Sequence, residues 1–185
     1  MDIFTAFGLS ISAGLNAYIP LLIVSLAAKF TDLITLKSPW DALTSWWVIG
    51  LLILLSIIEF FADKIPAVNH INDAIQTFVR PAAGAIVFAA TASIAEIHPV
   101  LAMVAGLLVA GGVHATKSAA VRPAVTATTG GVGNVPVSIL EDITSTILSI
   151  LAIIIPILIA MIVILITSWL VWWLWRRAKR EELVQ

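Results

Sequence analysis

Carboxylates occur at two places where the surrounding sequence is strongly apolar. Glu59 and Asp63 are four residues apart, so they share one face of a helix. Glu141 and Asp142 stand together at the expected start of the last apolar run, where acidic groups complement the helix dipole. Ionisable groups inside a membrane segment are functional candidates. The alternative is a structural ion-pair network, and Asp142 by itself reads as a helix-start residue.

Two arginine–proline steps supply charge of the opposite sign. Residues 79–83 read VRPAA and residues 121–125 read VRPAV. Proline favours the first turn of a helix, so Arg80 and Arg122 are each expected beside the positive end of a helix dipole. With the nearby Lys117 they predict a site for an anion such as a phosphate or carboxylate. The alternative is that the arginines are interfacial anchors whose charged ends reach the lipid headgroups.

One short phrase occurs twice in the chain. Residues 8–18 read GLSISAGLNAY and residues 106–116 read GLLVAGGVHAT. The alignment places Asn16 opposite His114, a polar residue after a glycine-rich turn of helix in each copy. We interpret both as candidate site residues, the alternative being that His114 is a hydrogen-bonded interior histidine.

The repeat, if structural, divides the chain into halves 1–97 and 98–178 of one transmembrane domain spanning 1–185. Gly14 matches Gly112 in the alignment. Three hydrophobic segments precede the second copy, and an odd number would invert the second half. Inverted repeats with broken helices are typical of transporters, whose sites lie near the bilayer midplane. The alternative is that glycine and alanine recur by chance.

Composition identifies the setting of these residues as a membrane. The 185 residues are 61% hydrophobic and 11% charged, whereas soluble domains carry about 25% charged residues. The net charge of −1 offers no basic field for nucleic acid. Cysteine is absent, and the three histidines lack metal-ligand spacing, so we expect no cofactor and no metal.

Apolar segments predict an all-α polytopic protein with five or six membrane segments, some kinked or re-entrant. The expected segments are 3–28, interrupted by glycine, asparagine and proline, then 46–62, 82–95, 99–115, and 139–175 with a kink at Pro156. Residues 65–81 read as an interfacial or short buried helix, with Asn69, Asn72 and Asp73 as its caps. Residues 117–138 read as the least regular part, while His70 and His98 read as interfacial.

The C-terminal end carries an aromatic and basic anchor. Four tryptophans between 169 and 175 precede the sequence RRAKR, so the tail 176–185 is expected on the cytoplasmic side. A cleavable signal peptide is not expected, because an acidic residue replaces the usual basic start.

Residues 59–86, EFFADKIPAVNHINDAIQTFVRPAAGAI, together with residues 133–142, GNVPVSILED, resemble a family of small bacterial integral membrane proteins catalogued only as a domain of unknown function. The resemblance covers nearly the whole chain. It implies an inner-membrane protein and brings no activity, substrate or catalytic residue.

Three classes of function fit these features. The first is a small transporter or channel for an anionic solute or a phosphorylated lipid headgroup. Its candidate site residues are Arg80, Arg122, Lys117, Asn16, His114, Glu59, Asp63 and Glu141. The second is a non-catalytic assembly or regulatory protein. A lipid-modifying enzyme is the least favoured, because no nucleophile motif or phosphate loop is present. A chain this small has few helices to enclose a path, so we expect a homodimer.

Overall fold

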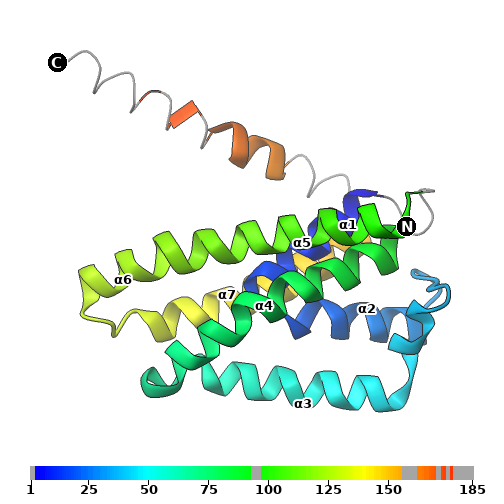
Figure 1. Cartoon of the computed structure of the whole chain (residues 1–185), viewed down its shortest axis with the longest axis horizontal. Coiled ribbons are helices and arrows are strands. Elements are labelled where there is room, and N and C mark those ends of the chain that lie inside the picture. The colour runs from blue at the N-terminus through cyan, green and yellow to red at the C-terminus, as the bar shows by residue number, and fades with distance from the viewer. Residues whose placement is uncertain (1–2, 93–96, 156–161, 170–171, 174–175, 177–185) are drawn as a thin grey trace.

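The chain folds into helices joined by short connections (Figure 1). The computed structural model describes residues 3–92, 97–155, 162–169, 172–173 and 176, and within these ranges it contains helices and turns but no strand. The α-helices are α1 (Ile3–Leu15), α2 (Tyr18–Phe30), α3 (Trp46–Ala62), α4 (Pro66–Thr91), α5 (Pro99–Thr116), α6 (Arg122–Thr129) and α7 (Asn134–Ile154). A 3-10 helix covers Trp40–Thr44, and a π-helical turn, Lys117–Val121, joins α5 to α6. The predicted all-α class is confirmed.

The first apolar segment is a hairpin of two short helices. α1 and α2 run in opposite directions and meet at Asn16 and Ala17 (Figure 1). Each has 13 residues, which is about 20 Å of helix against a hydrocarbon core of about 30 Å. The Asn16 side-chain oxygen accepts the backbone N–H groups of Tyr18 and Ile19, both at 3.1 Å, and so caps α2. The interruption therefore forms a turn between two short helices rather than a kink within one.

Within the described ranges, three helical stretches are long and apolar enough to cross a membrane. They are Ile71–Thr91, Pro99–Thr129 and Asn134–Ile154, while α1, α2 and α3 are shorter apolar helices. Large apolar side chains stand exposed on the outer faces, including Leu51, Ile58, Leu101 and Leu108. Surfaces this apolar are unusual on soluble monomers, so these helices are compatible with a membrane location. The expected five or six crossings stay a prediction.

Residues 65–81 and 82–95 do not form two separate segments as the sequence predicts, because α4 runs without a break from Pro66 to Thr91. Pro81 lies inside this helix, so Arg80 is not at a helix start. The apolar stripe that suggested an interfacial helix points outward, with Ile71 64% and Phe78 79% exposed. The polar face of α4 points inward instead, which is the reverse of the pattern in a water-soluble bundle.

Residues 117–138 are also more regular than the sequence predicts. Helix continues through the π-helical turn into α6, so Arg122 stands within a continuous 31-residue run rather than at a free helix end. A proline lacks the N–H that an α-helical turn needs, and a π-helical turn before Pro123 accommodates that loss. Gly130 and Gly131, with φ of 63° and 93°, then turn the chain back into α7.

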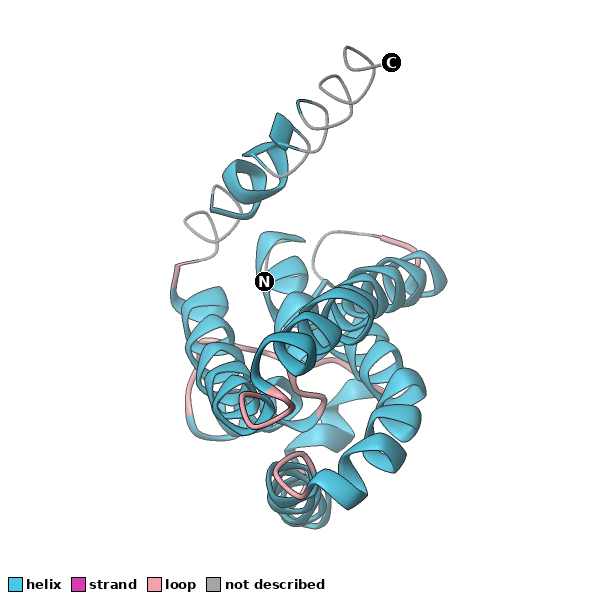
Figure 2. Ribbon diagram, turned by 90° about the vertical axis from the view of Figure 1, so that its left-hand side faces the viewer, coloured by secondary structure: helices cyan, strands magenta, loops and turns pink. Residues whose placement is uncertain are grey.

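Glu141 and Asp142 do not open the last helix, because α7 begins at Asn134 and places them in its second and third turns. The helix ends at Ile154. The kink expected at Pro156 and most of the tail 176–185 lie outside the described residues. Residues 162–169 continue as a helix that extends beyond the bundle in both views (Figures 1 and 2).

The two copies of the repeated phrase lie in α1 and α5, which run in the same direction. α4 pairs with α1 through Ser10 and Gly84 and with α5 through Gly84 and Gly106, antiparallel to both. The structure therefore does not confirm the inverted repeat, because the hairpin adds one reversal of the chain that the sequence does not reveal. The matched glycines also differ. A Cβ on Gly14 would overlap Ala110 and Val113 of α5, whereas one on Gly112 would meet open space.

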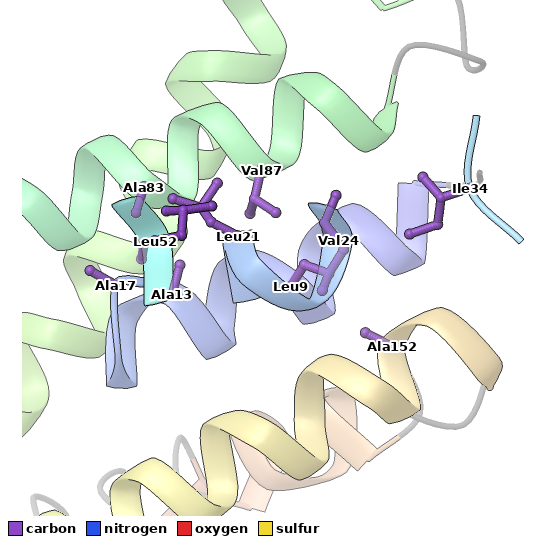
Figure 3. Close-up of a cluster of buried hydrophobic side chains, with 11 residues drawn as sticks. Leu9, Ala13, Ala17, Leu21, Val24, Ile34, Leu52, Ala83, Val87 and Ala152 are labelled. Atoms are coloured by element: carbon purple, nitrogen blue, oxygen red, sulfur yellow. The ribbon is translucent and has the colours of Figure 1, made fainter. Parts of the chain in front are cut away.

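Small residues let the central helices approach closely. A Cβ on Gly106 would collide with the Gly84 backbone and with Phe88, so α4 and α5 pack at backbone contact. Aliphatic side chains of α1, α2 and α4 fill the space above the hairpin, where Leu9, Leu21, Val24 and Val87 converge (Figure 3). This packing holds the two helices of the hairpin against α4.

Candidate functional site

Nine ionisable side chains form a buried charge network at the hairpin tip. Among the described residues seven ion pairs join side chains from α3 and the two residues after it, α4, the π-helical turn, α6 and α7. Six of them share members, and the seventh, Lys64–Asp142, lies beside them as a separate pair. The members of this charge network are Glu59, Asp63, Lys64, Asp73, Arg80, Lys117, Arg122, Glu141 and Asp142. Arg80 lies near the middle of α4, and His114 beside it lies near the middle of the continuous run Pro99–Thr129. Arg80 and His114 therefore meet halfway along the two longest helical stretches, whereas Glu59, Asp73 and Arg122 lie nearer the ends of their helices.

Arg80 is fully buried and lies at the centre of the network. Its Nε and Nη2 atoms donate to Glu59 Oε1 at 3.3 and 3.0 Å, and Nη2 also faces Asp63 Oδ2 at 3.4 Å. Nη1 lies 3.2 Å from His114 Nδ1. Because a guanidinium has only donors, that histidine nitrogen is the acceptor and carries no proton. The other ring nitrogen, Nε2, is then free to donate to Thr77 Oγ1 at 3.2 Å.

Arg122 and Lys117 extend the network from α6 and the π-helical turn. Arg122 Nη1 pairs with Asp73 Oδ2 at 3.0 Å, and Nη2 faces Asp63 at 3.4 Å and Glu141 Oε2 at 3.5 Å. Lys117 Nζ lies 2.5 Å from the same Glu141 oxygen and donates to the Leu15 carbonyl at 3.3 Å. That carbonyl belongs to the last residue of α1, a helix end whose carbonyls lack partners within the helix.

Asn16 joins the hairpin tip to α7. Its Nδ2 donates to Asp142 Oδ1 at 3.0 Å, while Lys64 Nζ donates to Asp142 Oδ2 at 2.9 Å. Asp142 is therefore a member of the site rather than the helix-start residue that the sequence predicts, and both of its oxygens have a donor. Deeper along α7, Ser12 donates to the Ser145 carbonyl at 2.7 Å and lies 2.6 Å from the Ser149 hydroxyl. A polar stripe of α7 thus lies against α1.

Two cavities reach the network from different sides. One of about 260 Å³ lies between α2, α3 and α7, with Asn16 and Asp142 in its wall. The other is a groove of about 840 Å³ lined mainly by apolar side chains of α1, α5, α7 and residues 162–167, with Lys117 and Glu141 in its wall. The neighbouring carboxylates Glu141 and Asp142 therefore face different cavities.

All eight residues that the sequence singles out lie in or against this site: Arg80, Arg122, Lys117, Asn16, His114, Glu59, Asp63 and Glu141. The arrangement differs from the one expected, because neither arginine stands at an isolated helix start. Each guanidinium already faces two or more carboxylates. Among the described residues, no group of three or more His, Cys, Asp or Glu side chains is arranged to hold a metal ion.

Sequence reasoning misplaces Asn72 and Asp73, which it assigns to helix caps. Asn72 Nδ2 donates to Asp63 Oδ1 at 2.5 Å, and Asp73 pairs with Arg122, both from inside α4. The available signal is their spacing, because 72, 73, 76 and 80 repeat at the period of one helix face. Ser138 of α7 also donates to Asp63 Oδ2 at 3.4 Å, with no comparable signal in the sequence.

An all-helical chain with three long apolar stretches and an internal charge network is compatible with a membrane protein. Comparison with family models matches residues 3–177 to the domain of unknown function DUF4126. The chain therefore belongs to this family, which confirms the resemblance seen in the sequence. Neither the curated proteins nor the solved structures yield a match.

Proposed function

We propose that this protein is a small membrane transporter or channel that moves an anionic solute through the charge network. The observation that carries the proposal is the position of Arg80, the centre of the network, halfway along α4 and beside His114, which lies halfway along the run Pro99–Thr129. Burying so many charges gains little stability compared with apolar packing. Polar groups at this depth are typical of solute or ion pathways.

Arg80, Lys117 and Arg122 are the residues that suit an anion. They come from α4, the π-helical turn and α6, and Arg122 links the other two because it shares Asp63 with Arg80 and Glu141 with Lys117. A planar guanidinium presents paired donors to a carboxylate or phosphate. An entering anion would take the place of a protein carboxylate at one of these cations, so binding and rearrangement of ion pairs would be a single event.

The two cavities support a path on either side of the hairpin tip. The smaller one ends at the Asn16–Asp142 contact and the larger one at Lys117 and Glu141. Adjacent residues line the two cavities, since Leu15 and Glu141 face the larger one and Asn16 and Asp142 the smaller one. A short displacement of the hairpin would connect the cavities, and hairpins that end at a binding site are suited to such movement.

A phosphorylated lipid headgroup is the second candidate substrate. The larger groove favours it, because its walls are apolar along most of their length and Lys117 lies in them. An acyl chain would fit the apolar part while the phosphate approached Lys117 and Arg122. This arrangement would place the headgroup and the network in direct contact.

Location and assembly complete the proposal. The tryptophan-rich end and the sequence RRAKR favour a bacterial inner membrane with the C-terminus in the cytoplasm. The small number of helices favours a homodimer in the lipid bilayer.

Reconstitution into proteoliposomes tests the function. Radiolabelled succinate and inorganic phosphate probe solute flux, and fluorescent phosphatidylglycerol probes headgroup movement between leaflets. Arg122→Gln is expected to lower the flux of the active probe about tenfold, since a lost charge-assisted contact is worth about 1.4 kcal/mol or more. Lys37→Gln removes the same charge from an exposed loop and serves as the control.

The outcomes separate the classes of function. Flux that falls in Arg122→Gln and persists in Lys37→Gln supports transport. Folded wild-type protein that moves none of the three probes would contradict the proposal and favour an assembly or regulatory protein. Chemical turnover of the lipid probe in detergent, with no sealed membrane, would favour an enzyme.

A further inference from the structure

Glu59 lies in the last turn of α3 and Asp63 follows the helix four residues later. The protein nevertheless supplies very different sets of hydrogen-bond donors to the two carboxylates. Asp63 Oδ1 accepts from Asn72, and its Oδ2 faces Arg80, Arg122 and Ser138. Both Asp63 oxygens therefore have donors, which favours the ionised form.

Glu59 has donors at one oxygen alone. Oε1 accepts from Arg80 and, at 3.5 Å, from the Ala17 backbone N–H. Oε2 is buried and has no hydrogen-bond partner among the described residues, while the side chain is 1% exposed. An ionised carboxylate is strongly disfavoured when one of its oxygens is buried and accepts no hydrogen bond. A proton on that oxygen neutralises the group and removes this cost in free energy.

The other carboxylates of the network are less suited to hold a proton. Asp142 has a donor at each oxygen. Glu141 shares one oxygen between Lys117 and Arg122. Asp73 also has an oxygen without a partner, but its side chain is 24% exposed and lies 3.0 Å from Arg122. Glu59 alone combines near-complete burial with an unpartnered oxygen among the described carboxylates.

Gln76 on α4 supplies a second buried acceptor that has no donor among the described residues. Gln76 stands one turn before Arg80 on α4, is 2% exposed, and has an unpartnered Oε1. The Tyr18 side chain interacts with both Gln76 and Glu59. A proton on Glu59 Oε2 would turn a buried oxygen that lacks a donor into a hydrogen-bond donor.

We propose that Glu59 is a proton-binding site, and that its protonation releases Arg80 for an anionic substrate. The carboxylate takes one proton from hydronium, leaving water and a neutral acid. Four cations then face four carboxylates instead of five, so the anion that enters at Arg80 travels with one proton. The coupling to transport rests on the proposed function, whereas the protonation does not.

Charged and titratable groups surround Glu59 on each packed element. They are Tyr18 on α2, Asp63 on α3, Arg80 on α4, His114 on α5 and Lys117 in the π-helical turn. His114 does not replace Glu59 as the proton carrier, because its Nδ1 faces the Arg80 guanidinium at 3.2 Å. A second proton there would set two donors against each other.

Infrared difference spectroscopy of the purified full-length protein in lipid nanodiscs tests the proposal without any substrate. Lowering the pH is expected to produce the carbonyl band of a buried protonated carboxylic acid. The band should be absent in Glu59→Gln, which keeps an oxygen for Arg80. It should persist in Asp142→Asn, the matched change at a carboxylate with two donors.

Isotope labelling protects the test against a variant that does not fold. Carbon-13 placed in glutamate carboxyl groups, with aspartate unlabelled, should shift the band of the wild-type protein. A wild-type spectrum without the band, a band that glutamate labelling does not shift, or one that survives in folded Glu59→Gln would overturn the proposal. None of these results would decide the transport proposal, which the flux assay of Arg122→Gln tests independently.

Discussion

Arg80 and Glu59 form an ion pair at 3.0 Å in which the two side chains are 0% and 1% exposed. Removing one member of such a pair leaves a buried charge without its partner. Arg80→Gln should therefore lower the free energy of unfolding by about 3–5 kcal/mol. Unfolding of the purified protein in mixed micelles, titrated with sodium dodecyl sulfate, measures this change.

The same pair yields a control for that measurement. Adding Glu59→Gln to Arg80→Gln removes the unpaired carboxylate, so the double variant should recover most of the lost stability. A double variant as unstable as the sum of its single changes would show that the two side chains are not coupled.

Glycines at the helix contacts make a second prediction. Gly84→Ala places a Cβ against Ala110 and the Gly106 carbonyl, so it should destabilise the fold by about 1–3 kcal/mol through overpacking. Gly112→Ala adds the same methyl group in open space and should change stability little. The midpoint of thermal unfolding in detergent measures both variants. Equal effects would contradict the close approach of α4 and α5.

The hairpin tip gives a third prediction through Asn16. Asn16→Asp retains an oxygen to cap α2 but replaces the donor to Asp142 with a second carboxylate, 3.0 Å away in the present geometry. Two carboxylates at this distance repel each other when both are ionised. The variant should be less stable than wild type at neutral pH, and acidification should narrow the difference because one carboxylate takes up a proton. A difference independent of pH would argue against the contact.

Cysteine chemistry can test the packing of α1 on α7, because the sequence contains no native cysteine. The Ser12 and Ser145 hydroxyls are 2.7 Å apart, so cysteines at these positions should form a disulfide on mild oxidation. Loss of labelling by a maleimide polymer measures the bond. Ser10→Cys with Ser145→Cys should remain reduced, since Ser10 instead contacts the Gly84 carbonyl of α4. Bond formation by the control pair alone would contradict the arrangement.

Sequence could predict the chemistry of the site better than the path of the chain through it. An apolar composition with a few charges of both signs indicates that those charges meet, and the eight candidate residues do so. The sequence does not distinguish a kinked helix from a hairpin at Asn16, since a broken helix and a turn have similar sequences. The predicted helix start at Arg80 is wrong, because proline is tolerated inside a helix when packing on both sides supports it.

The hairpin at Asn16 also explains why the relative direction of the two copies of the repeated phrase cannot be predicted from sequence. Whether its second copy is inverted depends on counting reversals of the chain, and the hairpin adds one within a single apolar segment. The sequence wrongly assigns Asn72 and Asp73 to helix caps because it does not reveal that the apolar stripe of α4 faces outward. Periodicity gives the two faces of a helix but not which of them is buried when the surroundings are lipid.

The central claim is that the charge network carries the transported solute. The double variant Glu59→Gln with Arg80→Gln tests it most directly when both its stability and its flux are measured against wild type. A buried ion pair that only locks the helices together can be replaced by neutral side chains without loss of activity. If the charge network carries the solute, the same replacement abolishes the flux. We predict that the folded double variant in proteoliposomes loses the flux of the probe that wild type transports. Flux equal to wild type from that variant would contradict the account.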